Sequence, residues 1–366
     1  MNDFQPHRIV PSYKVAVVQW VESDELARAL YQELAALGHD PQYFWCEDPL
    51  PPGVDVVFTF APYGHFLRIA SQLEQYKPER RPVLVHWNTE GMPDLRLPWW
   101  SVRTLGRMRS WAERLFDQPS SPVRKLLGSR ITAWQSSRML RFRYIGDYHY
   151  AYARGWLQVF ADSSAVYAQI HSRHGLPTHY FPWGAVPEWS ADLGLERDID
   201  VLWMGKRGTK RRGELLDRIT GELRRQGKTV YIADNEEQPY IFGAERTHYL
   251  NRAKIVLNIT RTWYDDNFSR FAMAAPNRAL IVSEPMLPHC PEYEAGVHYV
   301  SAPPAQLADA ILYYLEHEAK RARIVENAWR LLATDLTMRR SVQRVMDEVA
   351  SLLCRANATS HHQVEP

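Results

Sequence analysis

The sequence predicts an α/β protein with two doubly wound domains in series, each built on a parallel sheet. Short apolar runs rich in β-branched residues alternate with amphipathic segments along most of the chain, and this rhythm is typical of parallel strands covered by helices on both faces. This alternation of strands and helices is interrupted once, by the polar residues 186–197, and then resumes. The 366 residues are enough for two domains of the usual ~100–200 residues each.

The first predicted domain covers residues 1–186. Its opening strand is VAVVQW at 15–20, and the leucines that follow share one helical face up to Gly38, a residue type that commonly ends helices. Further strands are expected at 43–45, 54–60, 83–87, 157–161 and 178–183.

The second predicted domain covers residues 198–338. Its strands are expected at 199–205, 229–233, 255–259, 279–283 and 298–300, with amphipathic helices between them. A last helix is expected over 339–354 and a flexible tail over 355–366. Because ligands bind at the carboxyl ends of such sheets, two sheets in series can form opposite walls of one cleft.

Composition excludes several classes of protein. The net charge is +2 and only three cysteines are present, so neither a polyanionic partner nor a disulfide framework is indicated. The histidines lack the spacing of a zinc site, and we expect no bound metal. No apolar run approaches the ~20 residues that cross a bilayer, and the first residues lack the apolar core of a signal peptide. These features predict a cytoplasmic protein.

A basic turn follows the first strand of the second domain. It contains Gly205, Lys206 and Arg207 within MGKRGTKR. Glycines at a strand-to-helix turn allow a ligand close to the backbone, and the helix N-terminus that follows favours an anion. The turn matches neither GxxxxGK[ST] nor GxGxxG. It is therefore either a diphosphate site or an ordinary solvated loop.

A second group of polar residues follows the next strands of this domain. The expected strand at 255–259 is followed by Arg261, then by Asn267 and Arg270, and Glu284 ends the strand at 279–283. An arginine near a helix N-terminus can bind phosphate, and a carboxylate can accept hydrogen bonds from sugar hydroxyls. Taken singly, Arg270 fits a surface ion pair and Glu284 a capping acid. As a set at one sheet edge, they predict a ligand site.

The order of these motifs carries a resemblance to a known family. The segments NRAKIVLNI, IVSE, EYEAGVHY and ILYYLEHEAKRARIVENA, with Asn267 and Arg270 between the first two, resemble the C-terminal half of GT-B glycosyltransferases. The likeness is strongest to the bacterial branch with a family-1-like, spore-maturation-type domain. It covers residues 198–338, whereas the first half resembles the acceptor domain of these enzymes only in its rhythm.

The resemblance implies two Rossmann-like domains that face a cleft, and transfer of a sugar from a nucleotide-diphosphate donor to an acceptor hydroxyl. It assigns Arg270 and the turn at 205–207 to the diphosphate, and Glu284 or Glu292 to the ribose or the sugar. Enzymes of this fold need no obligatory metal, so the nucleotide sugar is the expected co-substrate.

One departure from the family pattern opens an alternative. With Arg270 and Glu284 in register, Met273 occupies the position of the family's acidic residue, and Arg278 that of its small glycine. The pair of glutamates eight residues apart in related retaining enzymes is also missing. The alternative is a degenerate GT-B protein that binds a glycan or a partner enzyme without turnover, and the stereochemistry stays open.

The first domain must supply the acceptor site and any catalytic base. His65 follows one expected strand, His86 lies at the end of the next, and Glu90 comes just after it. A base with a pKa near neutrality suits an inverting transfer. The alternatives are a helix-terminal residue for His65 and a core histidine for His86.

Residues 96–154 form a basic segment with twelve Arg or Lys, three Asp or Glu, and four interleaved tryptophans. Such a surface suits an anionic acceptor or peripheral contact with anionic lipid at the inner membrane face. No nucleic-acid recognition module accompanies the charge, and we expect no nucleic-acid partner. The alternative is that each arginine of this segment simply lies on the solvated face of a helix.

Overall fold

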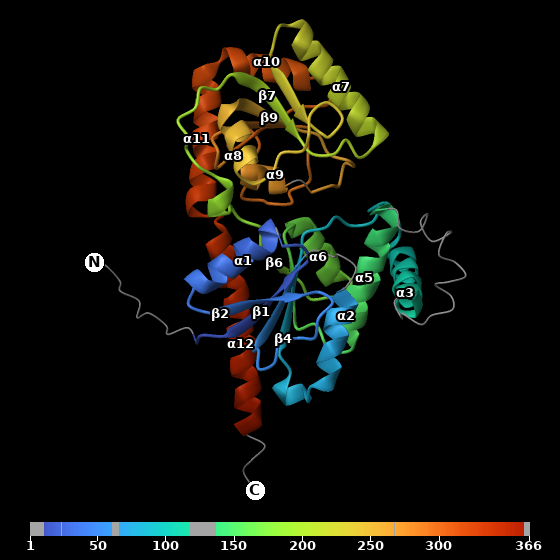
Figure 1. Ribbon diagram of the computed structural model, residues 1–366. Coiled ribbons are helices and arrows are strands. Elements are labelled where there is room, and N and C mark those ends of the chain that lie inside the picture. Colours follow the sequence, from blue (N-terminus) through green and yellow to red (C-terminus); the bar gives the residue numbers. More distant parts are fainter. Residues whose placement is uncertain (1–10, 23, 61–65, 117–136, 267, 362–366) are drawn as a thin grey trace.

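The computed structural model describes the chain except residues 1–10, 23, 61–65, 117–136, 267 and 362–366 (Figure 1). The described residues form two α/β domains, as predicted. The N-terminal sheet has the strand order β2-β1-β3-β4-β5-β6 and the C-terminal sheet the order β11-β10-β9-β7-β8. Every paired strand in both sheets is parallel to its neighbours.

The elements of the N-terminal domain alternate along the chain. Its strands are β1 Lys14–Gln19, β2 Asp40–Trp45, β3 Val56–Phe60, β4 Val83–Asn88, β5 Val159–Asp162 and β6 His179–Tyr180. Its helices are α1 Glu25–Ala36, α2 Phe66–Ser71, α3 Trp99–Phe116, α5 Ser137–Ala153 and α6 Ala165–Arg173, with 3₁₀ turns at Gln72–Gln75, Pro78–Arg80 and Pro187–Trp189.

The C-terminal domain repeats the pattern. Its strands are β7 Ile199–Met204, β8 Val230–Ala233, β9 Ala253–Asn258, β10 Leu280–Ser283 and β11 Val300–Ser301. Its helices are α7 Lys210–Arg225, α8 Gly243–Arg252, α9 Phe268–Ala274, α10 Leu307–Glu316, α11 Glu318–Thr334 and α12 Met338–His361.

The final helix crosses back to the N-terminal domain, and Figure 1 shows α12 running along it in red. The crossing is held by Ala185, whose N–H donates to the Leu336 carbonyl at 2.7 Å. A side chain at Gly184 would meet the Thr337 backbone at 2.3 Å, so only glycine fits there. The helix α12 then packs against α1 and β5 and runs to His361, beyond the predicted end at residue 354.

Two helices from the basic segment pack side by side. A Cβ built on Gly146 of α5 would lie 2.0 Å from the Gly106 carbonyl oxygen of α3. The two backbones can therefore meet only because both positions lack side chains. This contact positions α5 against the interdomain cleft, where Arg141 projects from its first turns.

Candidate functional site

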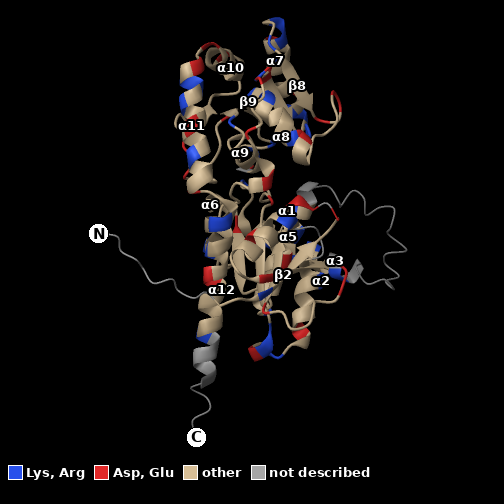
Figure 2. Cartoon of the chain, turned by 60° about the vertical axis from the view of Figure 1, so that its left-hand side comes forward, with Lys and Arg blue, Asp and Glu red and all other residues tan. Residues whose placement is uncertain are grey.

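A cleft of about 1100 Å³ lies between the two domains. Seven of its lining side chains are cationic and one, Asp94, is acidic. The cations are Arg96, Arg141, Lys206, Arg211, Arg212, Arg261 and Arg270. Elsewhere the two signs of charge are interspersed over both domains (Figure 2). We call this space the cationic cleft; such a concentration of one sign attracts an anionic ligand.

Two arginines of the cationic cleft are buried beside Trp203. Arg212 and Arg270 are 5% and 9% exposed, and their guanidinium carbons lie 4.7 and 4.3 Å from the ring centre of Trp203. Arg270 donates to the carbonyl of Met204 at 2.9 Å and to the Asn258 amide oxygen at 2.8 Å, which are both neutral acceptors. Among the described residues, neither arginine has an ion pair with a carboxylate.

Burial acts on the charge of both groups. It lowers the pKa of Arg212 to about 10, and the Arg261 charge adds to this effect. It lowers the pKa of Arg270 well below the ordinary value, with further contributions from Arg212 and Arg261. Because a buried, unpaired cation is unfavourable, an anionic ligand would stabilise this arrangement.

Local backbone structure brings these arginines together. Gly205 has a φ of +106°, and a Cβ there would meet the Arg270 guanidinium at 3.3 Å. Thr209 caps α7 by accepting a hydrogen bond from the Arg212 N–H. The capped end places Arg212 in the first turn, where the helix dipole also favours an anion.

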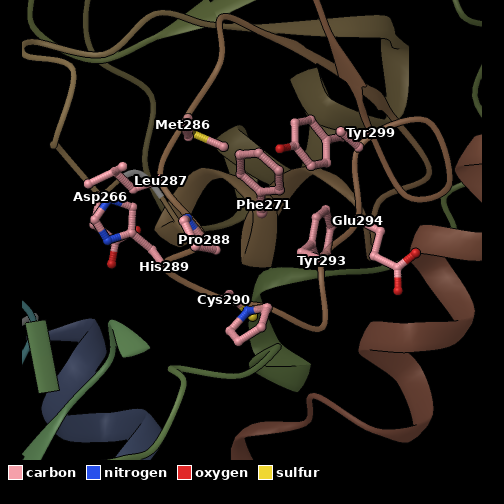
Figure 3. Close-up of a pocket in the computed structure, with 12 residues that line it drawn as sticks. Asp266, Phe271, Met286, Leu287, Pro288, His289, Cys290, Tyr293, Glu294 and Tyr299 are labelled. Carbon is pink, nitrogen blue, oxygen red and sulfur yellow. The ribbon is translucent and has the colours of Figure 1, made fainter. Parts of the chain in front are cut away.

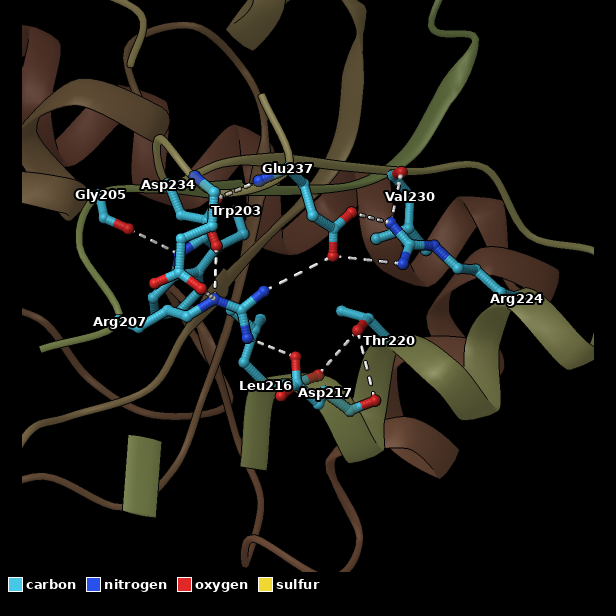
Figure 4. A network of polar contacts seen from close by, with 11 residues as sticks. Trp203, Gly205, Arg207, Leu216, Asp217, Thr220, Arg224, Val230, Asp234 and Glu237 are labelled. Atoms are coloured by element: carbon cyan, nitrogen blue, oxygen red, sulfur yellow. Dashed lines mark hydrogen bonds and ion pairs between the residues drawn. The ribbon is translucent and has the colours of Figure 1, made fainter. Parts of the chain in front are cut away.

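Arg207 does not enter the cationic cleft. Its guanidinium pairs with Asp234 at 2.6 Å and with Glu236 at 3.2 Å, and it also contacts Asp217 and Glu237 (Figure 4). These carboxylates hold the side chain beside β8 and α7. The predicted contact of Arg207 with a diphosphate is therefore not supported by its position, whereas Gly205 and Lys206 do lie at the cleft.

A shared carboxylate joins the two domains at the cleft. Asp265 is 1% exposed and accepts from Arg261 at 2.9 Å and from Arg141 of α5 at 3.3 Å. Arg261 therefore lies at the cleft as predicted, but it has an acidic partner. Asn267 lies outside the described residues.

The two predicted sugar-binding acids lie apart from each other. Glu284 accepts from the Thr260 N–H at 2.6 Å and pairs with Arg211, so it sits at the edge of the cationic cleft. Glu292 accepts instead from the hydroxyl of Tyr180 in β6, at 2.8 Å.

Glu292 neighbours a separate pocket of about 300 Å³ in the C-terminal domain. Figure 3 shows Tyr299 and Glu294 on one side of this pocket and Asp266 and His289 on the other. The position of Glu292 favours domain contact over sugar binding.

Of the two candidate bases that the structure describes, Glu90 lies in an interdomain cavity and His86 does not. His86 is fully buried in β4, its Nδ1 lies 2.9 Å from the Thr59 hydroxyl, and burial lowers its pKa to about 3. It cannot touch a ligand in the cleft, which corrects the expectation that it faces an acceptor. His65 lies outside the described residues.

Glu90 lines a pocket of about 680 Å³ between the domains, distinct from the cationic cleft. Burial raises its pKa above the ordinary value, while the charges of Arg141 and Arg261 oppose that rise. A carboxyl with a raised pKa, close to two arginines of the cationic cleft, is suited to accept a proton.

Comparisons with known proteins agree with this architecture. Residues 207–347 match the family model described as glycosyl transferase-like. The structure of Anabaena HepE in complex with UDP-glucose is similar at 12% identity and a TM-score of 0.54, over 93% of this chain and 100% of that chain. The chain has the GT-B fold. No curated protein matches the sequence.

Other GT-B structures give the same result. The avilamycin glycosyltransferase AviGT4 is similar at 13% identity and a TM-score of 0.52, over 93% of this chain and 98% of that chain. T4 phage BGT, solved with UDP and Mn²⁺, is similar at 12% identity and a TM-score of 0.52, over 92% and 99% of the two chains. At these identities the likeness shows the fold, and the C-terminal domain is the glycosyltransferase-like part.

Sequence reasoning missed two residues of the GT-B cleft. Arg212 stands on the apolar stripe of α7, in line with Leu216, Ile219 and Leu223, and an arginine on a buried stripe is a signal that could have been used. Arg141 carried no such signal, because its position depends on how α5 packs.

Proposed function

We propose that this protein transfers a hexosyl or related sugar from a nucleotide-diphosphate donor to an acceptor hydroxyl. The observation that carries the proposal is the pair of buried arginines, Arg212 and Arg270, that lacks a carboxylate partner among the described residues. The glycosyltransferase-like domain over residues 207–347 and the GT-B fold support it. HepE and T4 phage BGT were each solved with a uridine nucleotide.

The donor diphosphate would lie in the cationic cleft. The guanidinium groups of Arg212 and Arg270 can donate to phosphate oxygens, with Lys206 at the same wall. These contacts strengthen as the diphosphate leaves, because negative charge grows on its oxygens in the transition state. Side chains and the α7 N-terminus can supply this stabilisation, so our proposal assigns the reaction no obligatory metal or other cofactor.

Glu90 is the proposed base. It would take the proton of the acceptor hydroxyl while the acceptor oxygen attacks the anomeric carbon and the bond to the phosphate oxygen breaks. Such a direct displacement inverts the anomeric configuration, which NMR of the product can establish.

Calorimetric titration with UDP, GDP and dTDP tests the donor site. We expect at least one of them to bind, and the variant Arg270→Ala to bind it about ten- to a hundredfold more weakly. If none binds while an established UDP-dependent transferase does so under the same conditions, the proposal fails.

A second candidate function is binding without turnover. Met273, at the position of the family's acidic residue, lines the pocket that contains Glu90 and favours this alternative. Transfer or hydrolysis of a nucleotide sugar above background would exclude it. Nucleotide binding with no turnover over a donor and acceptor panel would favour it.

We also propose peripheral contact of α3 with an anionic membrane at the cytoplasmic face. Trp100, Met108 and Trp111 of α3 are 72%, 59% and 59% exposed, and Arg103 and Arg107 between them are also exposed. Exposed tryptophan and arginine on one helix fit the interface of a bilayer. Among the described residues, no helix has the length and apolar character to cross a membrane.

A further inference from the structure

The loop that carries Glu90 is held from within its own domain at its first residues. The buried side chain of Asn88, which ends β4, accepts from the Glu90 N–H at 3.3 Å and donates to the Glu90 carbonyl at 3.1 Å. The same side chain donates to Asp162 of β5 at 2.7 Å and accepts from the Tyr148 hydroxyl of α5 at 3.1 Å. These contacts fix the main chain at Glu90.

Arg141 of α5 supports the two residues that follow. A Cβ built on Gly91 would lie 2.9 Å from both Cζ and Nη2 of Arg141 and 3.1 Å from Nη1. Because these distances are nearly equal, the flat face of the guanidinium covers Gly91. Its Nη1 donates to the Met92 carbonyl at 3.2 Å. A side chain at position 91 would displace the guanidinium, so this close approach requires glycine.

The same guanidinium contacts the C-terminal domain. Nη2 of Arg141 donates to Oδ1 of the buried Asp265 at 3.3 Å. The other oxygen, Oδ2, accepts from Nε of Arg261 at 2.9 Å and from the Arg261 N–H at 3.3 Å, and Arg261 lines the cationic cleft. One side chain therefore joins the loop of the proposed base to the wall of the proposed donor site.

The charge of Arg141 also acts on the carboxyl of Glu90. Burial raises the pKa of Glu90. The charges of Arg141 and Arg261 oppose this rise, and that of Asp265 adds to it. Loss of the Arg141 charge would therefore raise the pKa of Glu90 further. The other charged residues that line the pocket of Glu90 are Asp24, Glu25, Arg246 and Asp266.

We infer that Arg141 is a positioning residue for sugar transfer, because it holds the loop of Glu90 against the turn that carries Arg261. The inference rests on the proposed function, since it takes Glu90 as the base. Arg141 acts through the main chain of the loop and through Asp265, and it takes no proton itself. A displacement of about 1 Å between reacting groups can cost about 10²-fold in rate, so a residue that only fixes this separation can control turnover.

The variant Arg141→Gln tests the inference in the full chain. We expect kcat, for the nucleotide sugar that the wild type turns over, to fall by about ten- to a hundredfold. Affinity for UDP, measured by calorimetry, should fall by about fivefold at most, as for one partly exposed charge. The acidic limb of the pH profile should move to higher pH, because the pKa of Glu90 rises.

Gly91→Ala separates the position of the guanidinium from its charge. The variant keeps Arg141, but the added Cβ displaces its guanidinium from the loop. We expect kcat to fall by about tenfold or more, with UDP affinity within about twofold of the wild type because no charge is lost. The matched control is Gly221→Ala on α7, where a Cβ would meet no atom within 4 Å, and its kcat should be unchanged.

Arg339→Gln controls for the loss of an arginine that pairs with a buried acid. Arg339 of α12 pairs with the buried Glu33 of α1 at 2.8 Å, and it does not line the cationic cleft or the pocket of Glu90. We expect this variant to keep the kcat and the pH profile of the wild type, even where its melting temperature falls as much as that of Arg141→Gln.

The outcomes distinguish this inference from the proposed function. If Glu90→Gln lowers kcat but Arg141→Gln and Gly91→Ala do not, the base stands and the inference is overturned. If only Arg141→Gln lowers kcat, or if Arg339→Gln lowers it equally, Arg141 does not act by position and the inference also fails. If the wild type shows no turnover, the inference falls with the transfer activity, while UDP binding still decides the donor site.

Discussion

The two sheet edges that face each other across the cleft differ in how their functional groups are assembled. The C-terminal edge supplies Lys206, Arg212 and Arg270 from segments that directly follow β7 and β9. The N-terminal edge supplies Glu90 after β4 and, from a helix far along the chain, Arg141. Under the proposed function, the C-terminal edge would hold the charge of the donor and the N-terminal edge would supply the base.

Replacing the base should have the largest effect on turnover. Glu90→Gln keeps the size of the side chain but cannot take a proton, and we expect kcat to fall by about 10²–10⁴-fold. Affinity for UDP should stay within about twofold, because neutral and charged side chains outside the cationic cleft alter phosphate binding little.

The pH profile gives an independent check on Glu90. Burial raises its pKa, and the group must be deprotonated to act. Activity should therefore fall with decreasing pH through a value above the ordinary 4.5 of a glutamate, and this limb should vanish in the variant. If Glu90→Gln leaves kcat unchanged, Glu90 is not the base, and the two edges do not differ in the way described above.

Removing the buried cation of the C-terminal edge should affect donor binding next most strongly. We expect Arg270→Ala to weaken UDP binding by about 1.5–3 kcal/mol, roughly ten- to a hundredfold, as charge-assisted contacts are lost. The thermal stability of this variant should fall by less than is typical for the loss of an ion pair. The partners of Arg270 among the described residues are the Met204 carbonyl and the Asn258 amide, which are both neutral.

Arg278→Ala is the matched control for that variant. Arg278 follows α9 and pairs with Glu326 of α11 at 2.7 Å, away from the cationic cleft. We expect its loss to change UDP affinity by a few tenths of a kcal/mol, or about twofold at most. If the two variants lose UDP affinity equally, with unchanged melting temperatures, the diphosphate binds elsewhere.

The sequence predicted the C-terminal edge better than the N-terminal one. Gly205, Arg270 and Glu284 follow strands that are recognisable from their apolar runs, and the carboxyl ends of parallel strands meet at one edge. Their proximity is therefore a local consequence of the sequence. Arg212 could have been added on the same grounds, since it interrupts an apolar stripe.

The errors arise where a side chain's direction depends on distant segments. Arg207 turns toward Asp234, which follows the next strand, and nothing in the turn itself specifies that direction. His86 belongs to β4, which lies between β3 and β5 and is buried throughout. The apolar run around His86 left a core histidine open as the alternative, and the place of β4 inside the sheet, which tertiary packing sets, decides in favour of that alternative.

A variant of Arg207 tests whether this residue of the C-terminal domain stabilises the fold or binds the diphosphate. Asp234 is buried, and loss of Arg207 would leave its carboxylate with backbone partners only. We expect Arg207→Ala to lower the free energy of unfolding by about 1–3 kcal/mol, measured by urea denaturation. Affinity for UDP should change little in protein that is still folded. A tenfold loss of UDP affinity with normal stability would return Arg207 to the diphosphate site.

The smallest expected effect concerns the outer face of the N-terminal domain. If α3 contacts anionic lipid, Arg107→Ala should weaken binding to phosphatidylglycerol vesicles by about fivefold, since one basic side chain near such a surface contributes about 1 kcal/mol. Arg330→Ala is the control, because Arg330 is also exposed but lies on α11 of the C-terminal domain, paired with Glu326.

The salt dependence of vesicle binding tests whether the attraction is electrostatic. Co-sedimentation of the wild type should fall as salt rises, because surface charges are screened over about 8 Å at physiological ionic strength. Trp111→Ala should weaken binding at every salt concentration, since 59% of this side chain is exposed and its insertion does not depend on charge. If Arg107→Ala and Arg330→Ala lose equal binding, the attraction belongs to the whole surface and α3 is an ordinary solvated helix.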